Sequence, residues 1–325
     1  MAEGLGRNFE KDIESSLLEL YDFPKNFQVT LLKYSENIIY KITFTERDPV
    51  VFRLHRNGYH TPEELRGEML WMKEIERDTD LLLPKIYVGR NGDVLQQISC
   101  KDTIYYCSVI SFLEGTILGE LQGAELFTAI EEMGEITAKL HKQSMERDRT
   151  NCLREFSWDI TNFFSENGVW GSWRAYPGLR GVDKQILAVC EEKITKILNE
   201  YGRTPDHYGL IHGDLHFYNI IRKDGKNQIF DFDDCGYGFY LYDLGCTLVT
   251  YSRDLKKLTA CWLKGYEKIR RLTQEEKELL PMFILLRRIV RLGWLASHWD
   301  SDTRKTVSEE YLSITVKMAR EWCLR

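Results

Sequence analysis

Long apolar stretches are absent from this sequence of 325 residues. No run approaches the roughly 18 apolar residues that a membrane-spanning helix needs. The first residues, Met1 to Arg7, also lack the apolar core of a secretory signal peptide. We therefore expect no membrane segment and a cytoplasmic location.

An excess of positive charge is also missing. The 44 Lys and Arg residues are outnumbered by 50 Asp and Glu residues, which gives a net charge of −6. Nucleic-acid-binding proteins usually carry a basic face, so this balance argues against a nucleic-acid partner. The eight cysteines form no C-x-x-C pair or other zinc-ligand spacing, which favours a reducing compartment over a disulfide framework.

The chain is long enough for two lobes, since single hydrophobic cores stop growing at about 250 to 300 residues. Its first part is rich in strand patterns. Three predicted strands separated by short turns form an antiparallel meander: 27–33, 38–45 and 50–54. Turn signals at Asn91-Gly92 and Lys101-Asp102 predict two further hairpins, with strands near 94–99 and 103–111. This part therefore reads as a small sheet of about five antiparallel strands.

One helix accompanies this sheet. Thr61 is a good cap, a proline follows it, and Glu64 completes a capping box. The helix should run to about Arg77, and Glu68 falls inside its apolar stripe. A carboxylate there is costly unless it is paired, and Arg53 on the preceding strand is the best candidate cation. The alternative is that Glu68 lies at the edge of the stripe, in water.

From about residue 112 the pattern changes from strands to helices. Phe112 to Gly115 is a natural hinge, because glycine permits the bend. We therefore expect an N-terminal lobe over 1–111, a hinge over 112–115 and a mainly helical C-terminal lobe over 116–325. The fold class is α+β. The predicted helices of the second lobe are 125–142, 182–201, 254–270, 275–298 and 303–323.

Oxygen-bearing side chains gather around one predicted hairpin. Asn219 and Asp231 are separated by two short strands around an Asp224-Gly225 turn. Because the two arms have equal length, Asn219 and Asp231 should end side by side at the open end. Asp214 lies on the loop that leads to this end. An amide and two carboxylates, with no thiolate, suit Mg²⁺, which takes one or two carboxylates together with substrate phosphates.

The pattern H-G-D-x4-N from His212 to Asn219, with Asp231 downstream, resembles a known family motif. It is similar to the Brenner motif and metal-binding aspartate of the aminoglycoside phosphotransferase and choline kinase-like family, which are relatives of the protein kinases. H-G-D-x4-N arises by chance in roughly one chain of this length in a thousand. The resemblance covers nearly the whole chain, since Arg53, Glu68 and the segment Phe112 to Gly115 match family positions before the motif. After the motif, Asp243 matches the family's short Asp-Leu signature. It implies a two-lobed protein-kinase-like fold.

The resemblance implies Mg²⁺-dependent transfer of the γ-phosphoryl group of ATP, with GTP as the alternative donor, to a hydroxyl of a small molecule. Asp214 would be the catalytic base, and Asn219 and Asp231 would hold Mg²⁺. His212 would support the catalytic loop, and Asp243 would do likewise by capping the helix that follows and by hydrogen bonding to the catalytic segment. The positions that match nucleotide-binding residues of the family are Ser35, Arg53, Glu68, Phe112 and Leu113.

The sequence departs from the pattern of related kinases in two features, and both concern binding of the nucleotide phosphates. The sequence has neither G-x-G-x-x-G nor G-x-x-x-x-G-K-[ST], so the turn 34–37, with Ser35, must cover them. Arg53 stands where protein kinases carry a lysine, and a planar guanidinium is not equivalent to an ammonium. Related small-molecule kinases carry Arg at this position, so we interpret it as a subfamily mark.

The phosphoryl acceptor is the least determined feature. Members of the family act on aminoglycosides, choline or ethanolamine, homoserine, methylthioribose, hydroxylysine and, in some cases, protein Ser or Thr. Asp233 and Asp234, with Trp158 and Trp173 of the aromatic-rich segment 156–179, are candidate contacts for an amino-alcohol or aminosugar. Solvated turn carboxylates and aromatic packing over helices are the alternatives for these residues.

Other functions stay open at this point. A Ser/Thr protein kinase of the same fold and a catalytically silent nucleotide-binding protein are two of them. A third is a metal-dependent hydrolase that uses His212, Asp214 and His216 with the later aspartates. The oligomeric state is not predicted.

Several basic residues outside the motif carry weaker expectations. His141 is expected to pack in a core or to lie at the surface. Arg287, Arg288 and Arg291, on the penultimate long helix, are expected to face solvent. The alternative for these arginines is contact with an acidic group of the substrate.

Overall fold

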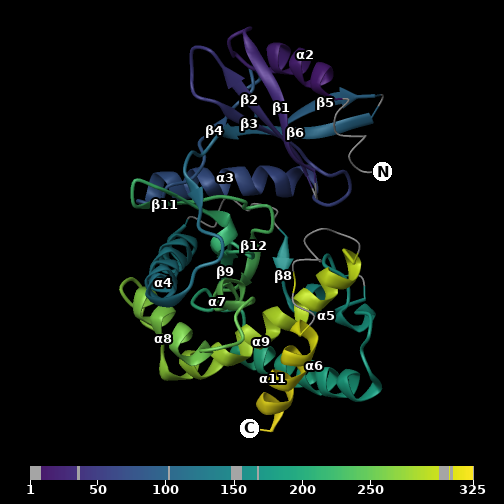
Figure 1. The fold of residues 1–325 in the computed structure, drawn as a ribbon, viewed down its shortest axis with the longest axis vertical. Coiled ribbons are helices and arrows are strands. Elements are labelled where there is room, and N and C mark those ends of the chain that lie inside the picture. Colours follow the sequence, from purple (N-terminus) through teal and green to yellow (C-terminus); the bar gives the residue numbers. More distant parts are fainter. Residues whose placement is uncertain are drawn as a thin grey trace. The chain divides into compact units, whose positions relative to one another are not determined.

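The computed structural model describes residues 9–34, 37–101, 103–147, 156–166, 168–299, 307 and 310–324. The chain divides into two compact units (Figure 1). Unit 1 comprises Met1–Leu118, Thr150–Glu155 and Ile220–Asp233. Unit 2 comprises Gly119–Arg149, Phe156–Asn219 and Asp234–Arg325. The lobe and hinge boundaries expected from the sequence stay a prediction.

Unit 1 is built on a six-stranded sheet with the strand order β1-β2-β3-β6-β4, in which β5 also pairs with β6. All of these pairings are antiparallel. The predicted meander is confirmed, because β1 pairs with β2 and β2 pairs with β3. The strands are β1 (Phe27–Tyr34), β2 (Ile38–Phe44), β3 (Val50–Leu54), β4 (Ile86–Tyr87), β5 (Gln96–Cys100) and β6 (Thr103–Ser111).

The hairpin predicted at Asn91-Gly92 is wrong, because β4 and β5 do not pair with each other. Both strands pair with the same edge of β6, opposite β3, and lie one after the other along it. Side-chain contacts direct the chain between them: Asn91 Oδ1 accepts a hydrogen bond from Gln96 Nε2 at 2.9 Å, and Arg66 binds Asp93 at 2.8 Å. The turn residues therefore mark a bend between two strands of one edge.

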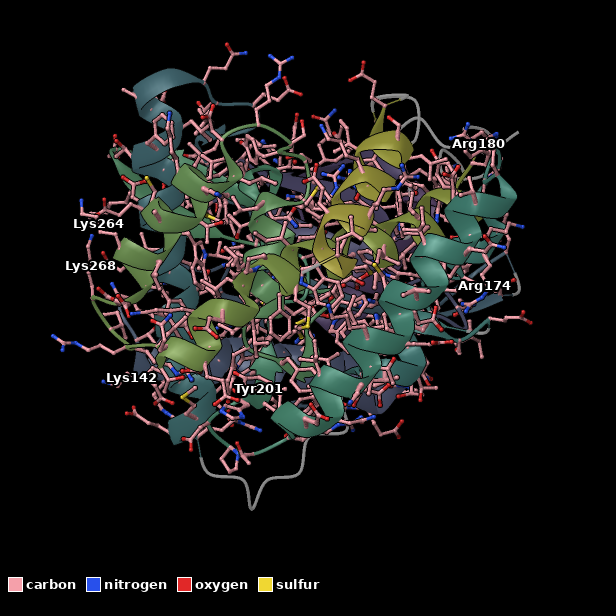
Figure 2. The ribbon with its side chains drawn as sticks, turned by 90° about the horizontal axis from the view of Figure 1, so that it is seen from below. Lys142, Arg174, Arg180, Tyr201, Lys264 and Lys268 are labelled. Carbon is pink, nitrogen blue, oxygen red and sulfur yellow. The ribbon has the colours of Figure 1, made fainter. Side chains whose placement is uncertain are left out.

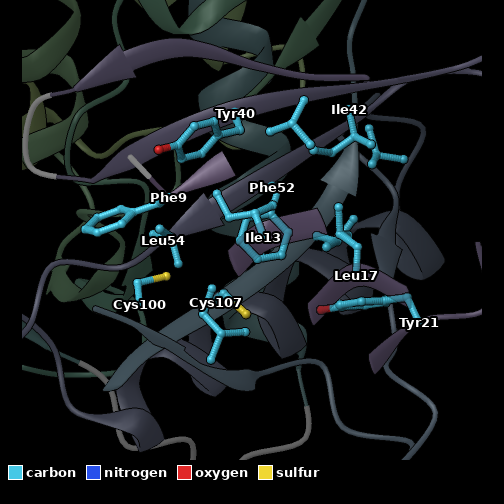
Figure 3. Close-up of a cluster of buried hydrophobic side chains, with 14 of the residues drawn as sticks. Phe9, Ile13, Leu17, Tyr21, Tyr40, Ile42, Phe52, Leu54, Cys100 and Cys107 are labelled. Atoms are coloured by element: carbon cyan, nitrogen blue, oxygen red, sulfur yellow. The ribbon is translucent and has the colours of Figure 1, made fainter. Parts of the chain in front are cut away.

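A core of buried apolar side chains lies between α2 (Glu10–Leu20) and the sheet (Figure 3). Ile13 and Leu17, one turn apart on the helix, are completely buried. Tyr40 and Ile42 on β2 and Phe52 on β3 complete this part of the cluster. Burying each such side chain contributes about 1.5–3 kcal/mol. The predicted strand alternation thus places one face of β2 in the core.

The helix α3 (Pro62–Asp78) begins as predicted. Thr61 Oγ1 accepts a hydrogen bond from the backbone N–H of Glu64 at 3.2 Å, and Glu64 Oε2 accepts one from the N–H of Thr61 at 2.8 Å. These reciprocal bonds satisfy two N–H groups that have no partner inside the helix. The apolar stripe of the helix is buried, and Glu68 is buried with it.

A second sheet of unit 1 has the order β11-β10-β7. The strands β10 (Ile220–Lys223) and β11 (Lys226–Ile229) form a hairpin in which Ile220 pairs with Ile229 and Lys223 pairs with Lys226. Asp224 and Gly225 have φ values of 51° and 74°, as a two-residue hairpin turn requires. The predicted equal-armed hairpin is confirmed. The strand β7 (Thr116–Ile117), directly after the segment 112–115, pairs with β10.

Unit 2 is mainly helical, with one small sheet of order β8-β12-β9. Its strands are β8 (Ser157–Trp158), β9 (Tyr208–Ile211) and β12 (Gly236–Phe239). Its helices are α4 (Gly123–Glu146), α5 (Ile160–Phe164), α6 (Gly181–Tyr201), α7 (Tyr242–Leu248), α8 (Leu255–Tyr266), α9 (Gln274–Ser297) and α11 (Tyr311–Cys323), with 3-10 turns η1 (Trp173–Ala175) and η2 (Phe217–Asn219). The last helix begins later than predicted, and residues 303–306 lie outside the described ones.

The helices α4 and α8 pack against each other, and surface charges link them. Lys264 and Lys268 contact the carboxylate of Glu131 at 2.7 and 2.9 Å, and Figure 2 shows both lysines near each other. Exposed pairs of this kind contribute at most about 1 kcal/mol. The completely buried Trp262 of α8 therefore matters more for this packing. Among the described residues, no helix has the length and apolarity to span a bilayer.

Candidate active site

The loop after β9 is held by one buried carboxylate in unit 2. Asp243 Oδ1 accepts a hydrogen bond from the backbone N–H of Gly213 at 2.9 Å, and its Oδ2 accepts one from the N–H of His212 at 3.1 Å. The predicted hydrogen bonding of Asp243 to this segment is confirmed. The predicted helix capping is wrong: α7 begins at Tyr242, its cap residue is Leu241, and no side chain caps it. The carboxylate binds the loop instead.

A second contact supports Asp243 from α4. His141 Nε2 lies 3.2 Å from Asp243 Oδ2, and its Nδ1 lies 2.8 Å from the hydroxyl oxygen of Tyr266. Burial lowers the pKa of His141, although Asp243 acts to raise it. The expectation that His141 packs in a core is therefore confirmed, and its ring also helps to hold the loop-binding carboxylate.

Gly213 takes a conformation that only glycine adopts easily. Its φ is +78°, and a Cβ at this position would lie 2.2 Å from the backbone oxygen of Asp234. The loop can therefore approach the start of β12 closely. This approach brings Asp214, the next residue, next to the segment that carries Asp234.

Asp214 is half-buried, and an arginine and a histidine contact its carboxylate. Its Oδ1 accepts a hydrogen bond from the guanidinium of Arg287, and its Oδ2 lies 3.2 Å from His216 Nε2. Burial acts to raise the pKa of Asp214, but His216 and Arg287 outweigh that effect and hold the pKa of the carboxyl well below its usual range. Asp214 is therefore ionised at neutral pH. An ionised carboxylate can accept a proton or a hydrogen bond from a hydroxyl.

Asn219 is tied to the same loop. Its side-chain Nδ2 donates to the backbone oxygen of Asp214 at 3.0 Å, and its backbone N–H donates to the oxygen of His216 at 2.9 Å. Because the amide nitrogen faces the loop, Oδ1 is the atom that a cation can take. His212, completely buried, accepts a long hydrogen bond of 3.4 Å from the N–H of Asp214 through its Nδ1. Both residues thus support the position of Asp214.

The solvated interpretation of Asp234 is wrong, because two indole groups bind it. Trp170 Nε1 donates to Asp234 Oδ1 at 3.2 Å, and Trp158 Nε1 donates to its backbone oxygen at 2.7 Å. Trp158 is completely buried, and Trp173 is 2% exposed and donates to Glu191 at 2.7 Å. Both tryptophans are therefore packed inside the protein, as the alternative to a substrate contact predicts.

In unit 1, Arg53 and Glu68 form the predicted ion pair. Arg53 donates through one nitrogen to both oxygens of Glu68, at 2.7 and 2.8 Å, and both side chains are buried. Asp233 lies 3.7 Å from the other terminal nitrogen of Arg53, so its solvated interpretation is also wrong. Burial acts to lower the pKa of Arg53, but Glu68 and Asp233 outweigh it and keep the guanidinium charged. The three residues form a buried charge cluster.

The sequence predicts further site residues in unit 1, at the nucleotide and the metal. Phe112 and Leu113 are half-buried, and the Phe112 ring lies under Lys41 Nζ at 4.0 Å from its centre. Asp231 is exposed and has a φ of +63°, which is uncommon for a residue other than glycine. Ser35 lies outside the described residues.

Arg287 and Arg288 are buried, so the prediction that they face solvent is wrong. Arg288 donates to the backbone oxygens of Val249 and Tyr251 at 2.8 and 3.2 Å, while Arg287 binds Asp214. The signal for this burial lies in the sequence, because the two arginines interrupt a long apolar run and residues 282–290 are all buried. Charges in such a run need partners. Periodicity alone does not identify those partners.

Comparison with known proteins places the chain in a family. The sequence model described as "Phosphotransferase enzyme family" matches residues 33–279. The chain is 23% identical over 319 residues to the amicoumacin kinase of Bacillus subtilis (strain 168), an alignment that covers 94% of this chain and 90% of that protein. It is also 24% identical over 240 residues to the hydroxylysine kinase of Bos taurus, covering 66% and 58% of the two chains.

Solved structures agree with this assignment. A microcompartment-associated aminopropanol kinase superposes with a TM-score of 0.79 at 29% identity, over 96% of this chain and 94% of that chain. An amicoumacin kinase in complex with AMP-PNP, Ca²⁺ and Ami superposes with a TM-score of 0.75 at 19% identity, over 99% and 96% of the two chains. The second likeness shows the fold alone.

The predicted α+β, protein-kinase-like fold is thus confirmed, as is the predicted reaction class. The enzyme is a kinase that transfers a phosphoryl group from ATP to a hydroxyl of a small molecule. The hydrolase alternative fails on the family match. The chain belongs to the phosphotransferase enzyme family.

Proposed function

We propose that this kinase phosphorylates the hydroxyl of a small amino-alcohol, with Mg²⁺·ATP as donor and Asp214 as catalytic base. The observation that carries the proposal is the loop of residues 212–219. Asp243 binds the loop at two N–H groups, and Asn219 binds the backbone oxygen of Asp214. A base held in this way can be positioned against an acceptor hydroxyl, and positioning supplies much of the catalysis in phosphoryl transfer.

In the proposed reaction, the acceptor oxygen attacks the γ-phosphorus as the bond between that phosphorus and the β,γ-bridging oxygen breaks. ADP leaves with the electron pair of the broken bond. The proton of the hydroxyl passes to Asp214, which is ionised beforehand because His216 and Arg287 lower its pKa. The base contributes most when the hydroxyl lies within hydrogen-bonding distance of its carboxylate.

Asn219 and Asp231 are the proposed magnesium ligands. The donor set fits this ion, because an amide oxygen and a carboxylate are hard ligands and Mg²⁺ takes its remaining ligands from water and phosphates. Asn219 satisfies its amide nitrogen within the loop, and Asp231 is an exposed residue. When bound, the ion would neutralise charge that develops on the nucleotide phosphates.

Arg53 is proposed to hold the α- and β-phosphates. Its pairing with Glu68 fixes the guanidinium at the end of β3, as the lysine and glutamate pair does in protein kinases. Phe112 and Leu113 are proposed to contact the adenine, and Ser35 to cover the phosphates.

The acceptor class follows from charge near Asp214. The carboxylate of Asp234 accepts a hydrogen bond from Trp170, and its backbone oxygen lies directly against Gly213, the neighbour of Asp214. A carboxylate there favours an acceptor with an ammonium group close to its hydroxyl. Asp233 suits this role less well, since it lies beside Arg53. The likeness to the aminopropanol kinase supports the same class.

A turnover screen tests the proposed function. The purified protein is given Mg²⁺ with ATP or GTP and one acceptor at a time: aminopropanols, ethanolamine, choline, hydroxylysine, homoserine, an aminoglycoside and a generic protein substrate. We expect ADP release with ATP, with the highest kcat/KM for a small amino-alcohol. A higher kcat/KM for an aminoglycoside, or ADP release without any acceptor dependence, would reject the proposed acceptor.

A further inference from the structure

Two cysteines of unit 2 face each other from two different helices. Cys190 lies on α6 and Cys323 on α11, 133 residues apart in sequence. Their Sγ atoms lie 2.7 Å apart, and Cys190 Sγ also donates to the backbone oxygen of Ala319 at 3.4 Å, one turn before Cys323. The helices α6 and α11 lie side by side (Figure 1). The contact therefore joins two helices that are distant in sequence.

The two thiols are placed for oxidation to a disulfide. An S–S bond is about 2.05 Å long, so the two sulfur atoms need to approach each other by only about 0.7 Å. Both cysteines are free in this structure. Cys190 is completely buried, whereas Cys323 is half-buried. Cys323 is therefore the sulfur that a dissolved oxidant reaches first.

A cation lies beside the pair. Lys193 is on α6, one turn beyond Cys190, and its Nζ lies over the Trp322 ring at 4.6 Å from the ring centre. Trp322 directly precedes Cys323 in sequence. A positive charge favours the thiolate form of a nearby cysteine, and the thiolate is the form that attacks an oxidant. Burial raises the pKa of Cys190 and outweighs the effect of Lys193, so the first attack is assigned to Cys323.

We propose that Cys190 and Cys323 are a reversible modification site, which hydrogen peroxide oxidises to a disulfide and a dithiol reduces again. The Cys323 thiolate attacks the peroxide, the O–O bond breaks, and a sulfenic acid forms as hydroxide leaves. Cys190 Sγ then attacks the Cys323 sulfur, the S–O bond breaks, and the thiol proton leaves with the hydroxyl group as water. The two thiols lose two electrons and two protons in total, and one peroxide molecule becomes two water molecules.

The disulfide fastens α11 to α6. The helix α11 also supports α9, because the Tyr311 hydroxyl donates to the backbone oxygen of Arg288 at 3.2 Å and Thr315 Oγ1 accepts from Arg288 Nε at 3.2 Å. A bond between residues 190 and 323 closes a long loop, and a disulfide stabilises a protein more when the loop that it closes is longer. The oxidised protein should therefore unfold at a higher temperature than the reduced protein.

Peptide mapping after oxidation tests the site. The purified protein is treated with hydrogen peroxide, alkylated without reduction and digested with trypsin, which releases Cys190 in residues 185–193 and Cys323 in residues 321–325. We expect a cross-linked peptide of these two segments, about 2 Da lighter than the two reduced peptides together because two hydrogen atoms are lost. Dithiothreitol should remove it. Oxidation of Cys323 to a sulfinic or sulfonic acid without the cross-linked peptide would overturn the proposal.

Thermal unfolding with and without dithiothreitol measures the effect of the bond. The oxidised wild type should unfold about 3–8 °C above the reduced wild type. C323S should lose this difference, and C190A replaces it if C323S does not fold. C261S removes another half-buried cysteine, on α8, and as the matched control should keep the difference. An equal difference in C323S, or none in the cross-linked wild type, would contradict the proposal.

Discussion

Asp243 Oδ1 accepts a hydrogen bond from the backbone N–H of Gly213 at 2.9 Å, although the two residues are thirty positions apart in sequence. This bond connects the first turn of α7 to the loop that carries Asp214. The same carboxylate also receives the N–H of His212. Asp243 is completely buried, so water cannot replace the hydrogen bonds that its carboxylate makes with two backbone N–H groups and a histidine. Loss of its charge should therefore affect both folding and catalysis.

Asp243→Asn tests this connection. The amide can accept through only one atom and brings an N–H₂ group toward backbone donors, so we expect a loss of about 2–3 kcal/mol in the free energy of unfolding. Turnover should fall about 10- to 100-fold, since Asp214 is then held less firmly. Urea unfolding and steady-state kinetics measure the two effects. Asp254→Asn, at an exposed position with a φ of 54° that Asn tolerates, should change neither by more than a small amount.

Gly213→Ala should lower the stability of the protein by more than the left-handed φ of this residue alone explains. A left-handed φ costs a residue with a Cβ about 1–2 kcal/mol, and here the new Cβ would also meet the backbone of Asp234 at 2.2 Å. Gly225→Ala is the matched control, because its φ is +74° and nothing lies within 4 Å of the added Cβ. Thermal unfolding of both variants should show the larger loss for Gly213. Equal losses would mean that the loop can move away from β12.

Substitutions of Arg53 and of Glu68 should lower the free energy of unfolding by different amounts. Arg53→Met leaves the buried Glu68 and the half-buried Asp233 without their shared cation and should cost about 3–5 kcal/mol. Glu68→Gln leaves Arg53 with Asp233 and should cost less, about 1–3 kcal/mol. Denaturant titration of the two variants gives the comparison. A larger cost for Glu68→Gln would show that Asp233 does not compensate Arg53.

Removal of divalent metal tests the proposed ligands. EDTA should abolish turnover, and added Mg²⁺ should restore it, since the ion neutralises the phosphates of the donor. Asp231→Ala should remove the Mg²⁺-dependent tightening of ATP binding in calorimetry. Asp224→Ala, in the turn of the same hairpin, serves as the control and should keep the tightening. If Asp231→Ala also keeps it, this residue does not hold the ion.

Asp214→Asn tests the base assignment. The amide is close in shape to the carboxylate but cannot accept the proton, so turnover should fall about 10²- to 10⁴-fold. ATP affinity, measured by calorimetry, should stay close to that of the wild type. An unchanged kcat would reject Asp214 as the base.

Local rules predicted the parts of the fold whose contacts are near in sequence. The capping box at Thr61 and the equal-armed hairpin of β10 and β11 each follow from residues a few positions apart. The Arg53–Glu68 pair was also accessible, because a carboxylate inside an apolar stripe requires a cation close by. In these cases, the energetic cost of an unsatisfied group identifies the partner.

The features that were predicted wrongly depend on distant contacts. Arg287 and Asp214 are 73 residues apart, and the sequence contains no rule that pairs them. At Asn91-Gly92 the turn residues are real, but pairing with β6 competes with a local hairpin, and β6 binds both strands. The local sequence predicts a solvated turn at Asp234, because its indole donors, Trp158 and Trp170, lie 76 and 64 positions away.

Following the product of one reaction tests the proposed phosphoryl transfer to a small-molecule hydroxyl. The wild-type protein is incubated with Mg²⁺·ATP and an aminopropanol, and ³¹P NMR follows the γ-phosphorus. We expect that ADP forms only when the acceptor is present and that the new signal is a phosphate monoester on the acceptor oxygen. ADP formation that gives only inorganic phosphate, or no reaction with any small-molecule alcohol, would contradict it.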